Sequence, residues 1–167
     1  MFGDIIDFRT CCDSKDRTEF LYQIFHNDFV RNRCYMADRI YIDPKSHEKK
    51  DGKEEIFWHI VTRKNRGRRE LDPPRAMRIK WVKSIILNHN HSEIKLFYYL
   101  EDNGKIRLYL WAYNYDFVVI LQKLGNGSSY LVTSFYIDNQ KKRDKFQKKF
   151  EDYTNKIDIR LDNCEWF

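Results

Sequence analysis

The stretch Phe117-Val118-Val119-Ile120-Leu121 is continuously apolar and strand-like, which is typical of a strand in the middle of a sheet. Together with its neighbours it gives four strand-like segments, over residues 94–100, 105–111, 116–123 and 130–137. Two of the breaks between them, Asp102-Asn103-Gly104 and Gly125-Asn126-Gly127-Ser128, favour tight hairpin turns. The pattern therefore predicts an antiparallel meander.

Helix-like segments flank this meander, over residues 14–30, 72–88 and 138–155, and a short strand is expected at 39–42. Ser14 or Asp16 can cap the first helix, and Asp138 can cap the last. Asp72 is suited to cap the second, since prolines follow it at the first helical positions. We predict an α+β fold in which N-terminal helices pack on a curved antiparallel sheet of about four to five strands, with a C-terminal surface helix.

With 167 residues, 42% of them hydrophobic and 16% aromatic, the chain is long and apolar enough to bury a core. We expect one domain over residues 1–167, with its core at about 14–157 and short tails. No stretch approaches the roughly 18 apolar residues of a membrane span. Residues 1–4 lack the character of a signal peptide. These features predict a cytoplasmic protein without a membrane partner.

The cysteines and histidines predict no metal and no cofactor. No metal or redox spacing relates the cysteines, Cys11, Cys12, Cys34 and Cys164. We interpret them as reduced thiols. His89 and His91 are two residues apart, but two ligands without a nearby Cys or acid make a weak metal site, and a surface loop is the favoured interpretation.

Charge is concentrated in one window, Arg63 to Lys83, which holds nine Lys or Arg and two acids. The window is net +7 while the chain is +6, so the remainder sums to −1. Such a patch attracts polyanions, nucleic-acid phosphate first among them. The alternative is a solvated basic loop without a ligand. The residues assigned to phosphate binding are Lys64, Arg66, Arg68, Arg69, Arg78 and Lys83.

A lone histidine stands at the edge of this patch. Residues 56–62 are interpreted as a strand whose alternation puts His59 and Arg63 on one face, roughly 13 Å apart. His59 is therefore a candidate general acid or base, with Arg63 beside it to hold phosphate. The alternative is a buried, hydrogen-bonded core histidine.

Two further strands carry candidate side chains. Thr133 and Tyr136 interrupt the apolar run 130–137, and a hydroxyl there can donate to a phosphate oxygen. Tyr109 and Trp111 share a face with Arg107, an arrangement suited to stacking unpaired bases of single-stranded RNA. Aromatic residues that face the core are an equally good interpretation of this pair.

These residues carry a resemblance to a known family. The segments concerned are Phe57 to Arg63, the arginine-rich loop 66–69, Arg78 to Lys83, Arg107 to Trp111 and Val132 to Tyr136. In order and character they resemble the phage- and prophage-associated nucleases of the barnase–EndoU–colicin–RelE-like superfamily. The resemblance covers about residues 39–150.

The resemblance implies N-terminal helices on a four-stranded antiparallel sheet and metal-independent RNA cleavage, commonly by toxins directed at tRNA or mRNA. The ribose 2′-hydroxyl would attack phosphorus and leave a 2′,3′-cyclic phosphate. By resemblance, His59 would be the acid or base, Arg63 and the loop arginines would neutralise phosphate, and Thr133 and Tyr136 would flank the scissile group. On an ideal strand only one of these two can face the site, and we favour Tyr136.

Such a toxin would have RNA as substrate and an antitoxin or immunity protein as possible partner. A rival class is a non-catalytic protein: an RNA-binding module or a phage-encoded inhibitor that uses the basic window. A host-defence component acting mainly through protein contacts is a third possibility.

Overall fold

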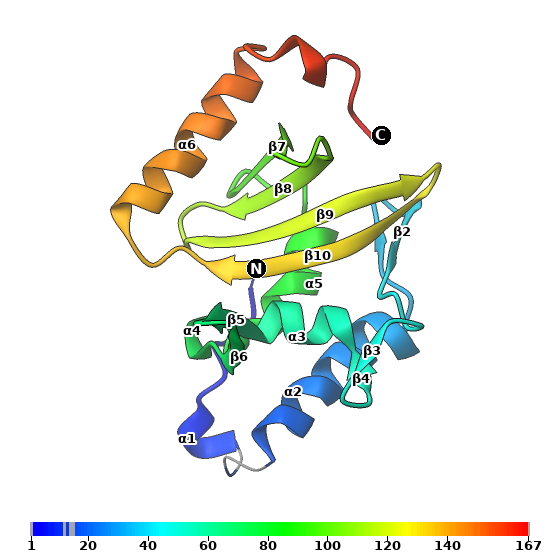
Figure 1. The fold of residues 1–167 in the computed structure, drawn as a ribbon, viewed down its shortest axis with the longest axis vertical. Coiled ribbons are helices and arrows are strands. Elements are labelled where there is room, and N and C mark those ends of the chain that lie inside the picture. The colour runs from blue at the N-terminus through cyan, green and yellow to red at the C-terminus, as the bar shows by residue number, and fades with distance from the viewer. Residues whose placement is uncertain (1, 12, 14–15, 167) are drawn as a thin grey trace.

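The computed structural model describes residues 2–11, 13 and 16–166, and its centre is a curved six-stranded sheet in the order β1-β2-β10-β9-β8-β7 (Figure 1). The strands are β1 Tyr35–Met36, β2 Ile40–Asp43, β7 Ile94–Leu100, β8 Ile106–Ala112, β9 Phe117–Gly125 and β10 Ser128–Tyr136. The predicted meander β7 to β10 is confirmed, and β9 lies inside the sheet with residues 117–121 buried. The α+β class is confirmed as well.

The sheet differs from the expected four to five antiparallel strands because β2 joins it in parallel. β2 pairs with β10 only at Ser128–Tyr130, and β1 extends the sheet beyond it. Beyond Tyr130 the edge of β10 is covered by helices rather than by another strand. The result is a mixed sheet in which the β10 edge beyond Tyr130 packs against helices α3 (Glu55–Val61) and α4 (Pro73–Ala76) in place of a strand.

Helices cover both faces of the sheet. Their bounds are α1 Phe8–Cys11, α2 Arg17–Phe25, the π-helix η1 His26–Arg31, α3 Glu55–Val61, α4 Pro73–Ala76, α5 Ile79–Leu87, α6 Gln140–Thr154 and the 3₁₀-helix η2 Ile159–Leu161. The main apolar cluster joins α2, α3 and α5 to one face, through residues such as Phe25, Ile60 and Ile85. A second cluster lies under α6 on the other face, where Phe146 and Phe150 pack. Across the described residues, no helix combines the length and the apolar character needed to span a membrane.

The expected strand at 56–62 is wrong, because these residues form helix α3. Its buried residues, Ile56, Phe57, Ile60 and Val61, follow helical spacing and pack into the main cluster. The apolar run is compatible with the residue spacing of a strand and with that of a helix, and packing against the sheet selects the helix. His59 and Arg63 therefore lie on different elements instead of sharing a strand face.

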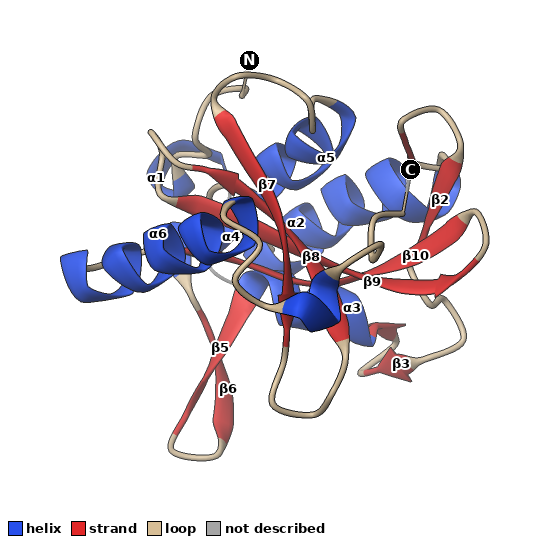
Figure 2. Ribbon diagram, turned by 90° about the horizontal axis from the view of Figure 1, so that it is seen from above, coloured by secondary structure: helices blue, strands red, loops and turns tan. Residues whose placement is uncertain are grey.

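The arginine-rich segment 65–69, expected as a loop, is the turn of a second small sheet. β5 Thr62–Asn65 pairs with β6 Arg68–Leu71, and the two-residue turn has positive φ at Arg66 (46°) and Gly67 (83°). This backbone suits a two-residue hairpin, and glycine adopts it without steric cost. The hairpin projects from the body of the molecule (Figure 2). A shorter hairpin, β3 Lys49–Lys50 with β4 Lys53–Glu54, lies before α3.

The helix boundaries follow local signals in part. Asp72 caps α4 as expected, accepting a hydrogen bond from the Arg75 amide, but the expected helix 72–88 divides into α4 and α5. The cap of α6 is Asn139 rather than Asp138. Asp16 precedes α2 without a capping hydrogen bond from its side chain, and Ser14 lies outside the described residues.

Candidate nucleic-acid interface and acid–base site

The β5–β6 hairpin carries the exposed part of the basic window. Arg63, Lys64, Arg66 and Arg68 are all exposed, and within the described residues their side chains form no ion pair. Arg69 is anchored, since its Nη1 donates to Thr62 Oγ1 at 3.2 Å. The hairpin thus presents a dense set of cations that are free to meet an anionic ligand.

Three further cations of the window, Arg75, Arg78 and Lys83, are tied into the protein, whereas Lys80 is exposed. Nη1 of Arg75 donates to the carbonyl oxygens of His59 (3.0 Å) and Thr62 (2.6 Å) at the C-terminal end of α3. These are carbonyls that a helix leaves without an internal partner, and a cation there also complements the helix dipole. Burial lowers the pKa of Arg75. Its role is structural, and the sequence had not singled it out.

Two residues assigned to phosphate binding are also engaged elsewhere. Arg78 donates to the Pro74 carbonyl at 2.6 Å and lies over the Tyr136 ring at 4.4 Å, and burial lowers its pKa. Lys83 pairs with Asp28 of η1 at 3.6 Å. Neither belongs to the hairpin surface, so the window predicted as one patch divides into the exposed hairpin, a set of packed cations and the exposed Lys80 of α5.

His59 lies where α3 runs beside the edge of β10. Its side chain is 31% exposed, and Nε2 is 3.6 Å from Oε1 of Glu55, one helical turn earlier. Burial lowers the pKa of His59, and the charges of Arg69 and Arg75 lower it further. Glu55 and a hydrogen bond to the Val132 backbone act in the opposite direction. The balance of these effects favours the uncharged form of the imidazole, which lies beside Glu55.

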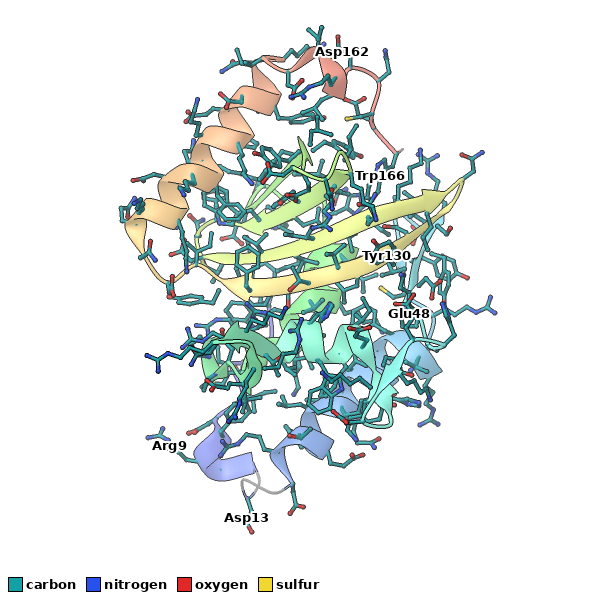
Figure 3. All side chains as sticks on the ribbon, viewed as in Figure 1. Arg9, Asp13, Glu48, Tyr130, Asp162 and Trp166 are labelled. Atoms are coloured by element: carbon teal, nitrogen blue, oxygen red, sulfur yellow. The ribbon has the colours of Figure 1, made fainter. Side chains whose placement is uncertain are left out.

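A cavity of about 220 Å³ opens next to this pair. Its lining comes from four parts of the chain: Lys45, Glu48, Glu55, Ile56, His59, Arg107, Tyr130 and Val132. Figure 3 labels Tyr130 on β10 and Glu48 near β3, which lie on two sides of this region. Lys45 is paired with Glu48 at 2.9 Å and lies over the Tyr130 ring at 4.3 Å. The cavity gathers acid, base and cationic groups that are far apart in sequence.

Thr133, rather than the favoured Tyr136, lies beside His59. A bulge in β10 between Leu131 and Thr133 shifts the alternation, so that Thr133 shares a face with Phe135 and not with Leu131. Thr133 Oγ1 donates to the His59 carbonyl at 3.0 Å. Tyr136 pairs with Phe117 and packs against the main cluster on the opposite face, so of these two residues Thr133 is the one that contacts His59.

The expected base-stacking surface is covered. Tyr109 and Trp111 are buried under α6, with Phe146 against both rings. The Tyr109 hydroxyl donates to Glu101, which also pairs with Arg107 at 3.7 Å. The core-facing alternative for Tyr109 and Trp111 is therefore correct, because α6 buries the face that carries them.

Comparisons with protein-family models, with curated proteins and with solved structures find no match. Function is therefore argued from the geometry of the site. Glu55 was missed at the sequence level because the strand interpretation put it away from His59. Glu55 and His59 are four residues apart, and on a helix this spacing places two side chains next to each other.

Where the chain is described, no group of three or more His, Cys, Asp or Glu is placed to hold a metal ion. Cys34 is buried, and burial raises the pKa of its thiol to about 11. Cys164 is also a free thiol with its pKa raised to about 11.

Proposed function

We propose that the protein binds RNA through the β5–β6 hairpin. The observation that carries this proposal is the set of exposed, unpaired cations on an element that projects from the body of the molecule. Each phosphate contact releases condensed counterions, so such a surface supplies affinity without sequence readout. The choice of RNA follows the resemblance of residues 39–150 to a ribonuclease superfamily.

Replacing Arg63, Lys64, Arg66 and Arg68 together by Gln should weaken RNA binding by more than tenfold. The slope of log K against log salt should fall by about one unit for every phosphate that the variant no longer neutralises. Fluorescence anisotropy over a salt series measures both quantities. Lys49→Gln with Lys50→Gln on the β3–β4 hairpin is the control, since these lysines are also exposed. An unchanged slope in the four-fold variant contradicts the proposal.

A specific observation also favours RNA cleavage as a second candidate function: the His59 ring lies 3.6 Å from Glu55 at the edge of a cavity. In the proposed reaction the His59–Glu55 pair accepts the 2′-hydroxyl proton and passes that same proton to the departing 5′-oxygen. The 2′-oxygen–phosphorus bond forms as the 5′-oxygen–phosphorus bond breaks, leaving a 2′,3′-cyclic phosphate. The resemblance extends this to a toxin acting on tRNA or mRNA and held in check by an antitoxin.

His59→Gln and Glu55→Gln should each lower single-turnover cleavage by about 10²–10⁴-fold while RNA binding is retained. Cleavage should persist in EDTA, and a DNA strand of the same sequence should stay intact because it lacks the 2′-hydroxyl. Gel analysis of end-labelled strands measures cleavage by the variants, cleavage in EDTA and cleavage of the DNA strand. A His59→Gln protein that is folded and cleaves at the wild-type rate excludes this site. Loss of cleavage in EDTA, restored by Mg²⁺, assigns the reaction to another class.

A further inference from the structure

Helix α6 carries a second basic surface, which the net charge of the chain conceals. Its first ten residues, Gln140 to Lys149, hold six Lys or Arg and one acid, Asp144. The charge outside the window 63–83 sums to −1 only because acids elsewhere offset this helix. Basic character is therefore present in two elements of the fold.

Within the part of the chain that the structure describes, some of the cations on α6 form ion pairs and others do not. Arg143 pairs with Asp116 and Lys142 with Asp138. Lys141 and Lys145, one helical turn apart, are exposed, and no ion pair or hydrogen bond of their side chains occurs among the described residues. They lie on the side of α6 away from Phe146 and Phe150, which pack on the sheet. The outer face of α6 thus resembles the hairpin in offering unpaired cations to solvent.

The base of the hairpin and α6 both lie near Phe135, close to the end of β10. The Thr62 carbonyl at the start of β5 accepts a hydrogen bond from Arg75 of α4, which contacts Phe135. The Arg75 guanidinium lies 5.9 Å from the centre of the Phe135 ring, and the Phe146 ring lies 5.6 Å from it on the α6 side. From this end of the sheet, the hairpin and α6 extend in different directions (Figure 2). A bulky anionic ligand at this end of the sheet meets cations from both.

The ring contacts of the surface indicate which form of nucleic acid fits. Proteins that bind single strands stack bases on accessible aromatic faces, whereas double-stranded RNA is held through its phosphates and sugars. Tyr109, Trp111 and Phe146 pack together beneath α6. The exposed aromatic residue of the described chain is Tyr115, 40% exposed, which packs edge-on against Phe2 and Trp81. Among the described residues, neither the hairpin nor the outer face of α6 therefore carries an aromatic ring on which a base could stack.

We propose that the ligand is base-paired RNA, held between the hairpin and the outer face of α6, with Lys141 and Lys145 contacting phosphates that the hairpin does not reach. This rests on the proposed function, RNA binding by the hairpin, and adds both the second contact surface and the form of the substrate.

The test compares a 20-nucleotide RNA strand alone with the same strand annealed to its complement, by anisotropy at several salt concentrations. The wild-type protein should bind the duplex at least tenfold more tightly. Lys141→Gln with Lys145→Gln should weaken duplex binding about tenfold and lower its salt slope by about two units, because each lysine is proposed to neutralise one phosphate. Lys49→Gln with Lys50→Gln is the matched control and should bind as wild type. Circular dichroism confirms that each variant is folded.

The outcomes separate the two proposals. Hairpin variants that weaken binding while the α6 variant does not leave the proposed function standing and overturn this inference. Equal or tighter binding of the single strand also overturns it. Unchanged affinity in both the hairpin and the α6 variants contradicts both proposals.

Discussion

At the scale of single residues, the backbone and the ring of His59 do different work. The His59 carbonyl accepts hydrogen bonds from Thr133 and Arg75, which fasten α3 to β10 and to α4. These anchors use main-chain atoms and persist when the side chain is replaced. The ring, by contrast, faces Glu55 and a cavity. Substitution of the ring therefore tests chemistry with limited damage to the fold.

Protonation of this ring should make stability depend on pH. Because the pKa of His59 is lowered in the folded protein, the unfolded chain binds its proton first as pH falls below about 6.5. The free energy of unfolding should therefore decrease as pH falls from about 6.5 to the folded-state pKa of His59, and should level off at lower pH. Urea unfolding at pH 7.5 and 5 measures this, with His59→Gln as reference, because the variant cancels the contribution of other groups. Equal decreases in both proteins would show that the ring is not shifted as described.

At the scale of elements, the sequence predicted correctly those strands and turns that depend on residues close together in the chain. The strands from 94 to 137 are separated by turn sequences that fix hairpins on their own, and the meander follows. Helix α3 was missed because the apolar residues of 56–61 fit the spacing of a helix as well as that of a strand. The helix is selected by contacts with Arg75 and with the sheet, which are distant in sequence. The bulge before Thr133 has no clear local signature, and it separates the face of Thr133 from that of Leu131.

The candidate site was predictable only in its residue types. His59 and the hairpin arginines were identified from an apolar run beside a basic one, but their mutual geometry assumed a strand. Glu55 became a candidate only once the helix placed it one turn from His59. The surface of α6 was hidden by summing charge over the whole chain instead of following it along each element.

At the scale of the whole molecule, the sheet separates two apolar clusters, and α6 alone among the long helices covers the second. The same helix therefore closes part of the core and presents the proposed RNA-binding lysines. Phe146 connects these roles, since its ring contacts Tyr109, Trp111 and Phe135. Stability of the second cluster and duplex binding should respond together when this ring is removed.

Phe146→Ala should destabilise the protein by about 2–4 kcal/mol, near the lower part of the range for truncating a core aromatic because the side chain is half-buried. The loosened α6 should also weaken binding of duplex RNA more than that of a single strand, since only the duplex is proposed to use Lys141 and Lys145. Chemical unfolding and anisotropy on the same preparations measure the two effects. Ile159→Ala removes a side chain in the same C-terminal part of the chain that is 78% exposed, and it should change stability by less than about 0.5 kcal/mol. If Phe146→Ala lowers stability but leaves duplex affinity intact below its melting temperature, α6 serves the core without contributing to RNA binding.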